Sequence, residues 1–182
     1  MKNLKRMIAD KFIELCSKMP IEKVTITLLV EKVGISKPTF YNHFKDKYDL
    51  IGWIYYQDLS QNDRVNDYLG EEEDFLVALK NIDQKRSFYK KALSMNDQNN
   101  LYEIMHNYNM DYNTNALKSL LKTDELPMDL KYAMEYHSYG GVNYLIKWLK
   151  EESPMSPEEL SRLMYLYAPS IMKEAWNRKI DE

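Results

Sequence analysis

Apolar residues recur at helical spacing along almost the whole chain. Over the first twenty residues they are Leu4, Met7, Ile8, Phe12, Leu15 and Met19. Intervals of three and four residues place such side chains on one face of an α-helix. No run of alternating apolar and polar residues stands out, as a half-buried strand would show. The pattern predicts an all-α fold, and five glycines and six prolines are too few for a many-turned β-sandwich or barrel.

Loop signals divide the pattern into separate predicted helices. These cover residues 4–19, 26–33, 37–44, 47–68, 72–81, 83–95, 99–122, 128–151 and 157–178. Pro169 lies inside the last of them and removes one backbone hydrogen bond, so it predicts a bend there. Gly140 and Gly141 lie inside the helix before it and cost about 2 kcal/mol relative to alanine. This cost predicts a close helix crossing that offsets it.

Composition excludes several classes of protein. A single cysteine, Cys16, rules out an internal disulfide and a multi-thiolate zinc site. No stretch approaches the ~20 apolar residues of a membrane helix. The basic N-terminus leads into a helical pattern and not into the apolar core of a secretion signal. We therefore expect a cytoplasmic protein with no membrane partner, no metal and no cofactor.

Charge is distributed unevenly along the chain. The first fifty residues carry ten Lys and Arg against six Asp and Glu, a net charge of +4, although the whole chain carries −3. A basic N-terminal part on an acidic remainder suggests that the former faces an anion, such as a phosphate backbone or lipid. An accidental asymmetry of a solvated surface is the alternative.

Two short predicted helices, 26–33 and 37–44, are joined by a tight connection typical of a helix-turn-helix. Gly34 suits the left-handed position that ends the first helix. Thr25 and Ser36 are suited to cap the two N-termini, and Pro38 lies in the first turn, where its missing N–H costs little. Two hydrophobic staples are expected, Val24 with Leu29 and Ile35 with Phe40.

The second short helix has one apolar face and one unusual polar face. At about 100° per residue, Phe40 and Phe44 point toward the core. The outward residues are Lys37, Pro38, Thr39, Tyr41, Asn42 and His43. They include a cation, hydroxyls, an amide and an imidazole, groups that suit base edges and phosphates in a DNA major groove. A merely solvated helix, the alternative, would more often expose Glu and Lys.

Residues 5–52 resemble the DNA-binding domain of TetR/AcrR-type transcriptional regulators. The matching elements are Thr25, the Gly34-Ile35-Ser36 turn, Thr39-Phe40-Tyr41, His43-Phe44, Lys47 and Leu50. The resemblance implies a three-helix DNA-binding domain over residues 1–50 and a helical bundle for dimerisation and effector binding over residues 51–182. It implies DNA contacts from Thr27, Lys37, Pro38, Thr39, Tyr41, Asn42, His43 and Lys47. Tyr41 and Lys47 match positions that usually contact phosphates.

The helix over 128–151 carries apolar and aromatic residues on two faces. One stripe is Leu130, Met134, His137, Gly141, Leu145 and Trp148, and the other is Tyr132, Tyr136, Tyr139 and Ile146. Two such faces predict packing on both sides. Together with the last helix, this one resembles the pair that forms the family's dimer interface. We therefore expect a homodimer on a palindromic operator, with an intramolecular hairpin as the alternative.

Residues 75–176 resemble a subgroup that includes regulators of dihydroxyacetone kinase operons. Some members of that subgroup respond to a protein co-regulator instead of a small molecule. Aromatic and methionine residues in the middle of the chain suit an adaptable apolar cavity or, alternatively, a plain core. The candidate effector-pocket residues are Tyr89, Tyr102, Met105, His106 and His137.

The function expected from these observations is that of a homodimeric transcriptional repressor released by an effector. The alternative is an activator or co-regulator controlled by a protein partner, without a small-molecule pocket. An enzyme is not expected, because no His-Glu pair has metalloprotease spacing and no nucleophile–His–Asp order is recognisable.

Overall fold

The computed structural model describes residues 4–59, 72–95, 101–152 and 154–177, and every regular element within these ranges is a helix. In chain order the helices are α1 (Leu4–Lys18), the 3-10 turn η1 (Ile21–Lys23), α2 (Ile26–Val33), α3 (Lys37–Tyr41), α4 (Lys47–Leu59), α5 (Glu72–Gln84), α6 (Arg86–Leu93), α7 (Leu101–Leu120), α8 (Met128–Lys150), α9 (Pro157–Leu166) and α10 (Ser170–Trp176). The all-α prediction is confirmed. None of these helices is both long enough and apolar enough to cross a membrane.

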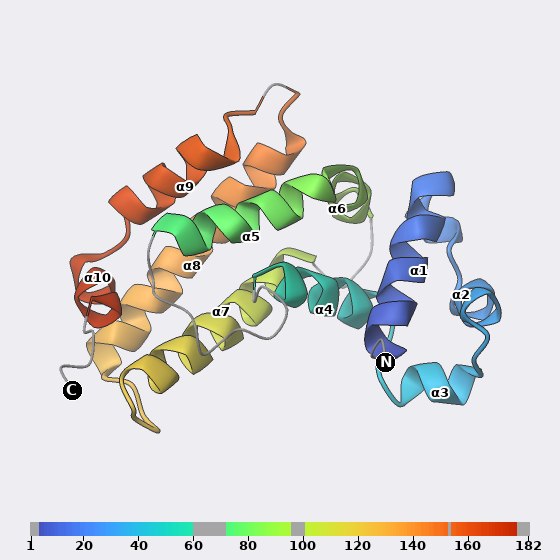
Figure 1. Ribbon diagram of the computed structural model, residues 1–182, viewed down its shortest axis with the longest axis horizontal. Helices are drawn as coiled ribbons and strands as arrows, with labels where there is room; N and C mark the ends of the chain where they lie inside the picture. Colours follow the sequence, from blue (N-terminus) through green and yellow to red (C-terminus); the bar gives the residue numbers. More distant parts are fainter. Residues whose placement is uncertain (1–3, 60–71, 96–100, 153, 178–182) are drawn as a thin grey trace.

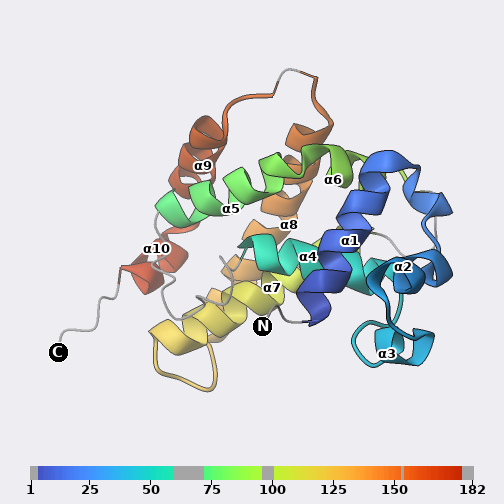
Figure 2. The same ribbon diagram turned by 45° about the vertical axis from the view of Figure 1, so that its right-hand side comes forward.

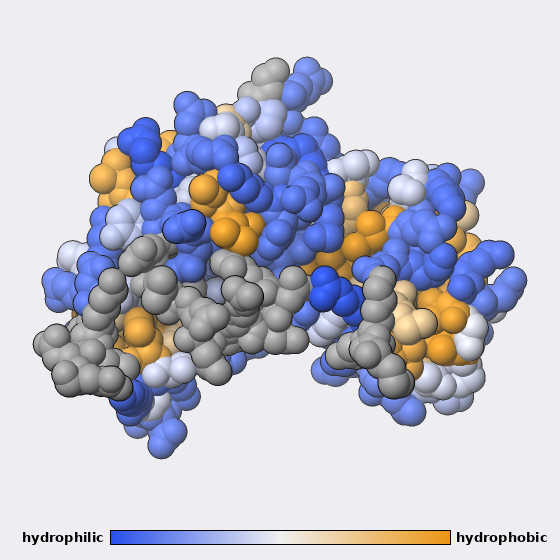
Figure 3. All heavy atoms as spheres, in the orientation of Figure 1, coloured by the Kyte–Doolittle hydropathy of each residue, from blue (hydrophilic) through white to orange (hydrophobic). Residues whose placement is uncertain are grey.

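Helices α1, α2 and α3 form one end of the molecule, which we call the head, and α5 to α10 form the body (Figure 1). Helix α4 begins beside the head and packs in the body against α5 and α7, while α5 lies alongside α9 and α7 alongside α8 (Figures 1 and 2). The expected division at residue 50 falls inside α4, so this helix joins the two parts. The face drawn in Figure 3 is mainly hydrophilic, with apolar residues in separate patches.

The helix-turn-helix has the local structure that its capping residues predict. Thr25 Oγ1 accepts a hydrogen bond from the amide of Leu28 at 3.1 Å. Gly34 ends α2 with a φ of 80°, in the left-handed region that favours glycine. Ser36 Oγ accepts from the amide of Thr39 at 3.2 Å and so caps α3. These three residues fix where both short helices begin and where the first ends.

The second short helix is shorter than the sequence predicts. A helix over 37–44 is expected, but α3 ends at Tyr41, and Asn42 and His43 form a turn. The reason lies in the start of the next helix. Asp46 Oδ1 accepts hydrogen bonds from two amides in the first turn of α4, at 2.8 and 2.9 Å, and such a capping residue requires non-helical backbone. The chain therefore leaves α3 early to enter α4.

The single bent helix expected over 157–178 is also wrong. Helix α9 ends at Leu166, and α10 starts after Pro169, at Ser170. Proline breaks the helix because it offers no amide to the preceding turn, and Lys173 Nζ instead donates to the carbonyl of Leu166 at 2.7 Å. Helix α10 then packs against α8 and α7. Residues 60–68 of the expected 47–68 helix, and residue 178, lie outside the described ranges.

A buried charge cluster joins α4 to α5 and α6. Asp58 on α4 is 5% exposed, and its carboxylate accepts from Lys85 Nζ and from the Tyr89 hydroxyl, each at 2.6 Å. Asn81 Nδ2 donates to the carbonyl of Asp58 at 3.2 Å. Burial is the main cause that raises the pKa of Asp58 above its ordinary value, and Lys85 opposes that shift. This cluster fixes α4 within the body.

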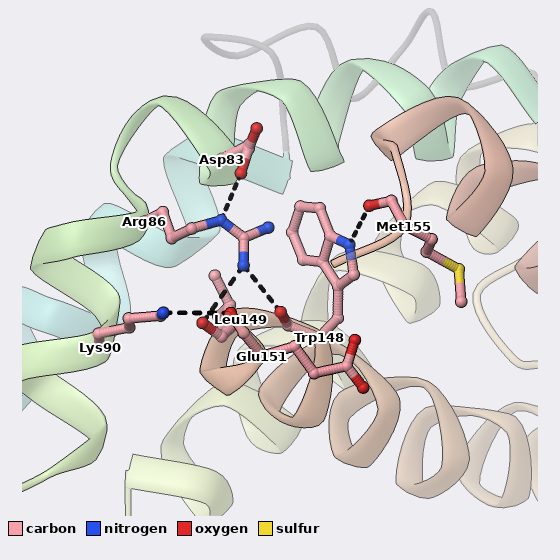
Figure 4. Close-up of polar contacts among 7 residues, drawn as sticks. All are labelled: Asp83, Arg86, Lys90, Trp148, Leu149, Glu151 and Met155. Atoms are coloured by element: carbon pink, nitrogen blue, oxygen red, sulfur yellow. Dashed lines mark hydrogen bonds and ion pairs between the residues drawn. The ribbon is translucent and has the colours of Figure 1, made fainter. Parts of the chain in front are cut away.

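Helix α6 is attached to the end of α8 by two basic side chains (Figure 4). Arg86 Nη1 donates to the carbonyls of Trp148 and Leu149, at 2.7 and 3.2 Å, and its guanidinium lies 3.9 Å from the centroid of the Trp148 ring. Lys90 Nζ donates to the carbonyl of Glu151 at 3.2 Å. The last carbonyls of a helix have no intrahelical partner, and cations there also complement the helix dipole.

The same helix, α6, also holds the end of α1. Lys91 Nζ donates to the carbonyl of Cys16. Phe88 packs edge-on against Phe12, with 6.0 Å between ring centroids. Helix α6 therefore contacts both the head and the C-terminal end of α8.

Candidate nucleic-acid interface

Two phenylalanine rings anchor α3 and the turn after it to the head. Phe40 is fully buried and Phe44 is 2% exposed, with 5.7 Å between their ring centroids. Phe44 also packs against Trp53 of α4 at 5.8 Å, and Lys5 Nζ of α1 lies 5.3 Å from the centroid of its ring. The expected orientation of both rings toward the core is confirmed. It leaves the opposite side of α3 to solvent.

The outward side of α3 carries the residues that the sequence analysis assigns to DNA. Lys37, Pro38, Tyr41 and Asn42 are exposed, with Tyr41 at 54%, and Thr39 and His43 are half-buried. Thr27 on α2 is exposed as well. The structure thus brings these side chains to one end of the head.

Two of the expected DNA-contacting residues have hydrogen-bond partners within the head. The Thr39 hydroxyl lies 2.8 Å from Ser36 Oγ, within the cap of α3. Lys47 is half-buried, and its Nζ donates to the carbonyl of Ile21 at 3.3 Å. The Thr39 hydroxyl keeps hydrogen-bonding capacity beyond this contact, since a hydroxyl has one donor and two acceptor sites. An ammonium has three donors, so the bond to Ile21 leaves Lys47 Nζ with further donors.

Two carboxylates order the loop after α3. The sequence predicts one of them, Asp46, as the cap of the helix that starts at Lys47, but sequence reasoning missed the second, Asp49. Asp46 caps α4, and Asp49 Oδ2 accepts from the amide of Lys45 at 2.9 Å. The Asp-x-x-Asp spacing at the start of a helix is the signal that could have revealed Asp49, because carboxylates are favoured in a first turn. They hold the loop that connects the candidate DNA-reading helix to α4.

Two hollows lie in the body. The interior hollow measures about 60 Å³ and lies among α4, α5, α7, α8 and α9. Its polar lining is Tyr55, Asp74, Asn109, Tyr112, Asn113, His137 and Ser138. The outer groove measures about 360 Å³, lies between α8 and α9, and shares His137, Gly141 and Met164 with the interior hollow. Ligand pockets for drug-sized molecules occupy about 300–1,000 Å³, so the groove reaches that size and the interior hollow does not.

The structure does not bring the five candidate effector residues together. Tyr89 and Met105 are fully buried in the core, where Tyr89 donates to the carboxylate described above. Tyr102 and His106 stack on each other at 6.3 Å beside α8. Of the five, His137 is the residue that lines the two hollows. Burial, followed by the charge of Lys173, lowers the pKa of His137, which favours its neutral form.

Helix α8 exposes a row of tyrosines on the side away from the core. Tyr132 is 71% exposed and Tyr136 72%. We call this surface the tyrosine face, made up of Met128, Tyr132, Tyr136 and Tyr144 of α8 together with Leu166 and Tyr167 at the end of α9. The close helix crossing expected at the glycine pair is not found within this chain. A Cβ at Gly141 would make only an ordinary contact, 3.6 Å from the end of the Met164 side chain of α9, and Gly140 faces open space.

No group of three or more metal-ligating side chains occurs among the residues that the structure describes.

Comparisons with known proteins agree with this arrangement. Residues 10–52 match the family described as bacterial regulatory proteins, tetR family. Residues 71–169, more than half of the chain, match the family described as transcriptional regulator C-terminal region. The first match contains the whole helix-turn-helix, and the second contains α5 to α9.

Transcriptional regulators are among the individual relatives. An HTH-type dhaKLM operon transcriptional activator, DhaS from Lactococcus lactis, is 28% identical over 88 residues, which are 47% of this chain and 46% of that protein. The match thus spans under half of the relative's length. A solved structure of a dihydroxyacetone kinase operon activator, DhaS, superposes with a TM-score of 0.60 at 18% identity, covering 94% of this chain and 97% of that one.

A second solved structure, a TetR transcriptional regulator from Streptococcus agalactiae 2603V, gives a TM-score of 0.55 at 18% identity and covers 90% and 92% of the two chains. At these identities the superpositions establish the fold. With both family matches, which extend from the DNA-reading helices into the helical body, they show that this chain belongs to the TetR family of bacterial transcriptional regulators.

Proposed function

We propose that this protein is a homodimeric transcriptional regulator that binds a palindromic DNA operator in the cytoplasm and catalyses no reaction. The observation that carries the proposal is the anchoring of α3 by two buried phenylalanines, which presents Tyr41 and Asn42 outward. The proposed DNA-contacting residues are Thr27, Lys37, Pro38, Thr39, Tyr41, Asn42, His43 and Lys47. Each half of the dimer would place α3 in a major groove.

The proposed contacts divide into two classes. Tyr41 and the two lysines, Lys37 and Lys47, are suited to phosphates and set the position of the head on the duplex. Asn42 is suited to the two hydrogen-bonding groups of an adenine edge, and the apolar surface of Pro38 to a thymine methyl group. The first class supplies affinity and the second supplies sequence preference.

Alanine substitutions at two adjacent positions should separate these classes. Tyr41→Ala is expected to weaken binding to all duplexes by a similar factor, because a phosphate contact carries no base information. Asn42→Ala is expected to lose about 1–3 kcal/mol of discrimination at one base pair. Gel shifts on the operator and on single-base variants measure both effects. If neither variant changes DNA binding, the assignment of the interface is wrong.

Selection from random duplexes at one fixed salt concentration tests the function as a whole. A dimer should select a palindrome with half-sites about 34–36 Å apart, or a multiple of that distance. Affinity for the selected duplex should then fall steeply with salt, because lysines release counterions from the phosphates. An interaction through protein partners alone would give no selected sequence and no such slope.

The tyrosine face supports the proposed dimer. Tyr136 at 72% and Tyr167 at 77% exposure leave much aromatic surface in water, and tyrosines are enriched at protein interfaces. The outer groove lies beside this face, and Gly140 leaves room for a closely approaching helix. A two-fold axis through the face would pair α8 and α9 of one protomer with the same helices of the other.

Tyr136→Glu should dissociate this dimer. A carboxylate at the centre of an aromatic interface loses its water on association, and central tyrosine positions typically contribute about 2 kcal/mol or more, so the dissociation constant should rise at least about thirtyfold. Light scattering measures the mass, which is 21.8 kDa for one chain. Asn107→Glu, at an exposed position of α7, is the matched control. A Tyr136→Glu protein that stays dimeric contradicts the proposed interface.

We propose that the regulator is a repressor released when an effector binds the body. Any effector acts by preferring one arrangement of the two heads over another. A second candidate is an activator controlled by a protein partner. It is supported by the small volume of the interior hollow, about 60 Å³, and by the position of the larger groove beside the proposed dimer surface. The relative DhaS is named an activator, which is compatible with this candidate.

A reporter fused to the selected operator decides between the two. If the protein represses, removing its gene should raise reporter expression. If it activates, removing its gene should lower expression.

A further inference from the structure

One contact joins the body directly to the loop that follows α3. It starts at Gly52 in α4, over which α7 passes closely. A Cβ at position 52 would lie 2.7 Å from Cδ2 of Tyr108 and 2.6 Å from Cγ2 of Ile104. Both distances are too short for real contacts, so only glycine permits this approach. The Tyr108 ring is thereby placed against α4, next to the helix turn that faces the head.

The ring of Tyr108 lies over Gly52, and its hydroxyl extends along α4 to the first turn of that helix. It donates to Asp49 Oδ1 at 3.0 Å, and Asp49 Oδ2 accepts from the amide of Lys45 at 2.9 Å. One carboxylate therefore bridges a side chain of α7 and the backbone of the loop after α3. Burial and the neighbouring carboxylate of Asp49 raise the pKa of Tyr108, so the hydroxyl keeps the proton that it donates.

This bridge lies where the body meets the segment that follows α3. Lys45 lies four residues after Tyr41, the last residue of α3. Contacts between α6 and α1 hold the other side of the head, at Phe12 and Cys16. With α1 held by α6 and the loop after α3 held by α7, the angle between the head and the body is fixed at two separate points.

We propose that Tyr108 is a positioning residue that sets the distance between the two α3 helices of the dimer, and so the half-site spacing that the regulator accepts. This inference rests on the proposed dimeric, DNA-binding function. In a two-fold dimer a small rotation of each head moves the two α3 helices in opposite directions. A rigid attachment therefore selects one spacing, and a looser attachment accepts several.

Neighbouring residues of α7 place Tyr108 beside the interior hollow. Asn109, Tyr112 and Asn113 line that hollow. The ring of Tyr56 contacts both Tyr108 and Tyr112, with centroids at 5.9 and 6.1 Å. A shift of α7 caused by events in the body would thus reach the Asp49 bridge through adjacent residues of one helix.

The test uses the full-length protein and a series of duplexes. These carry the selected half-sites at the preferred spacing and with one or two base pairs added or removed. Tyr108→Phe keeps the ring over Gly52 and removes only the hydroxyl. It should weaken binding at the preferred spacing about two- to tenfold, the range that one hydrogen bond contributes. Binding at the altered spacings should fall less or rise, so that discrimination between spacings shrinks.

Tyr165→Phe is the matched control. It also removes the hydroxyl of a half-buried tyrosine, on α9 of the body, where the ring stacks on Trp176 with 6.4 Å between centroids. It should leave the spacing profile unchanged. Asp49→Asn and the double variant with Tyr108→Phe complete a cycle. If both groups act through one link, the double variant should match the stronger single variant, because effects within one network do not add.

The outcomes separate the inference from the function on which it rests. A wild-type protein without any spacing preference contradicts the proposed dimer on DNA. If the wild type prefers one spacing and Tyr108→Phe keeps the same preference, the role of Tyr108 is overturned, provided that circular dichroism shows the variant to be folded. A uniform loss of affinity at all spacings also overturns the role of Tyr108, because such a loss indicates general destabilisation of the protein.

Discussion

Replacing Phe40 by alanine is expected to lower the free energy of unfolding of the head by about 3–5 kcal/mol, the usual cost of removing a buried aromatic ring. Phe40 is fully buried and packs against Phe44 and Tyr41. Helix α3 has only five residues, and without the Phe40 ring it is held by its N-terminal cap and by Phe44. Operator binding should therefore be lost along with stability. Urea unfolding followed by circular dichroism and a gel shift at the same temperature measure the two effects.

Tyr41→Ala serves as the control for this substitution, because it removes an adjacent aromatic ring that is 54% exposed. Exposed substitutions usually change stability by less than about 0.5 kcal/mol. The control should lose affinity for DNA and keep the wild-type unfolding midpoint. If Phe40→Ala unfolds at the wild-type urea concentration, then the ring does not anchor α3 and the proposed interface loses its support.

Asp58→Ala should destabilise the body by a comparable amount, about 3–5 kcal/mol, because one partner of a buried ion pair is removed. The change leaves the Lys85 ammonium and the fully buried Tyr89 hydroxyl without their acceptor. Asp58→Asn should cost less, since an amide oxygen still accepts from one of them. Urea unfolding of both variants checks the order. Equal stability of Asp58→Ala and wild type would show that the cluster contributes nothing.

The same carboxylate predicts a dependence of stability on pH. Burial raises the pKa of Asp58 above its ordinary value of 3.8, so the folded protein takes up this proton more readily than the unfolded chain. The stabilisation is fully present below the ordinary pKa and is lost as the pH rises through the folded pKa. Acidification from pH 7 toward 4 should thus stabilise wild type relative to Asp58→Asn. The opposite trend would mean that pairing with Lys85 outweighs burial.

Features with local causes were predictable from the sequence. Thr25, Gly34 and Ser36 act on amides or backbone angles within three residues of themselves, and the structure places all three in their expected roles. The inward direction of Phe40 followed from helical periodicity alone. The length of α3 was not predictable in this way, because Asp46 of the next element determines where it ends.

Features that depend on distant contacts were not predictable. Asp58 bonds to residues 27 and 31 positions later, and Tyr108 to one 59 positions earlier, and periodicity carries no information about such pairs. The five candidate effector residues lie in different surroundings for the same reason, although Tyr102 and His106 stack on each other. A helical pattern shows that Tyr89 and Met105 face inward, but both are buried in packed core and line neither hollow.

The double attachment of α6 limits how such regulators can be recombined. Phe88 and Lys91 fit the end of α1, and Arg86 and Lys90 fit the end of α8. A hybrid that grafts the first fifty residues of another regulator onto this body would present a foreign surface to half of that eight-residue helix. Exchange of operator preference by grafting therefore requires a donor head with an aromatic ring at position 12, or a redesigned α6 that keeps its contacts with the end of α8.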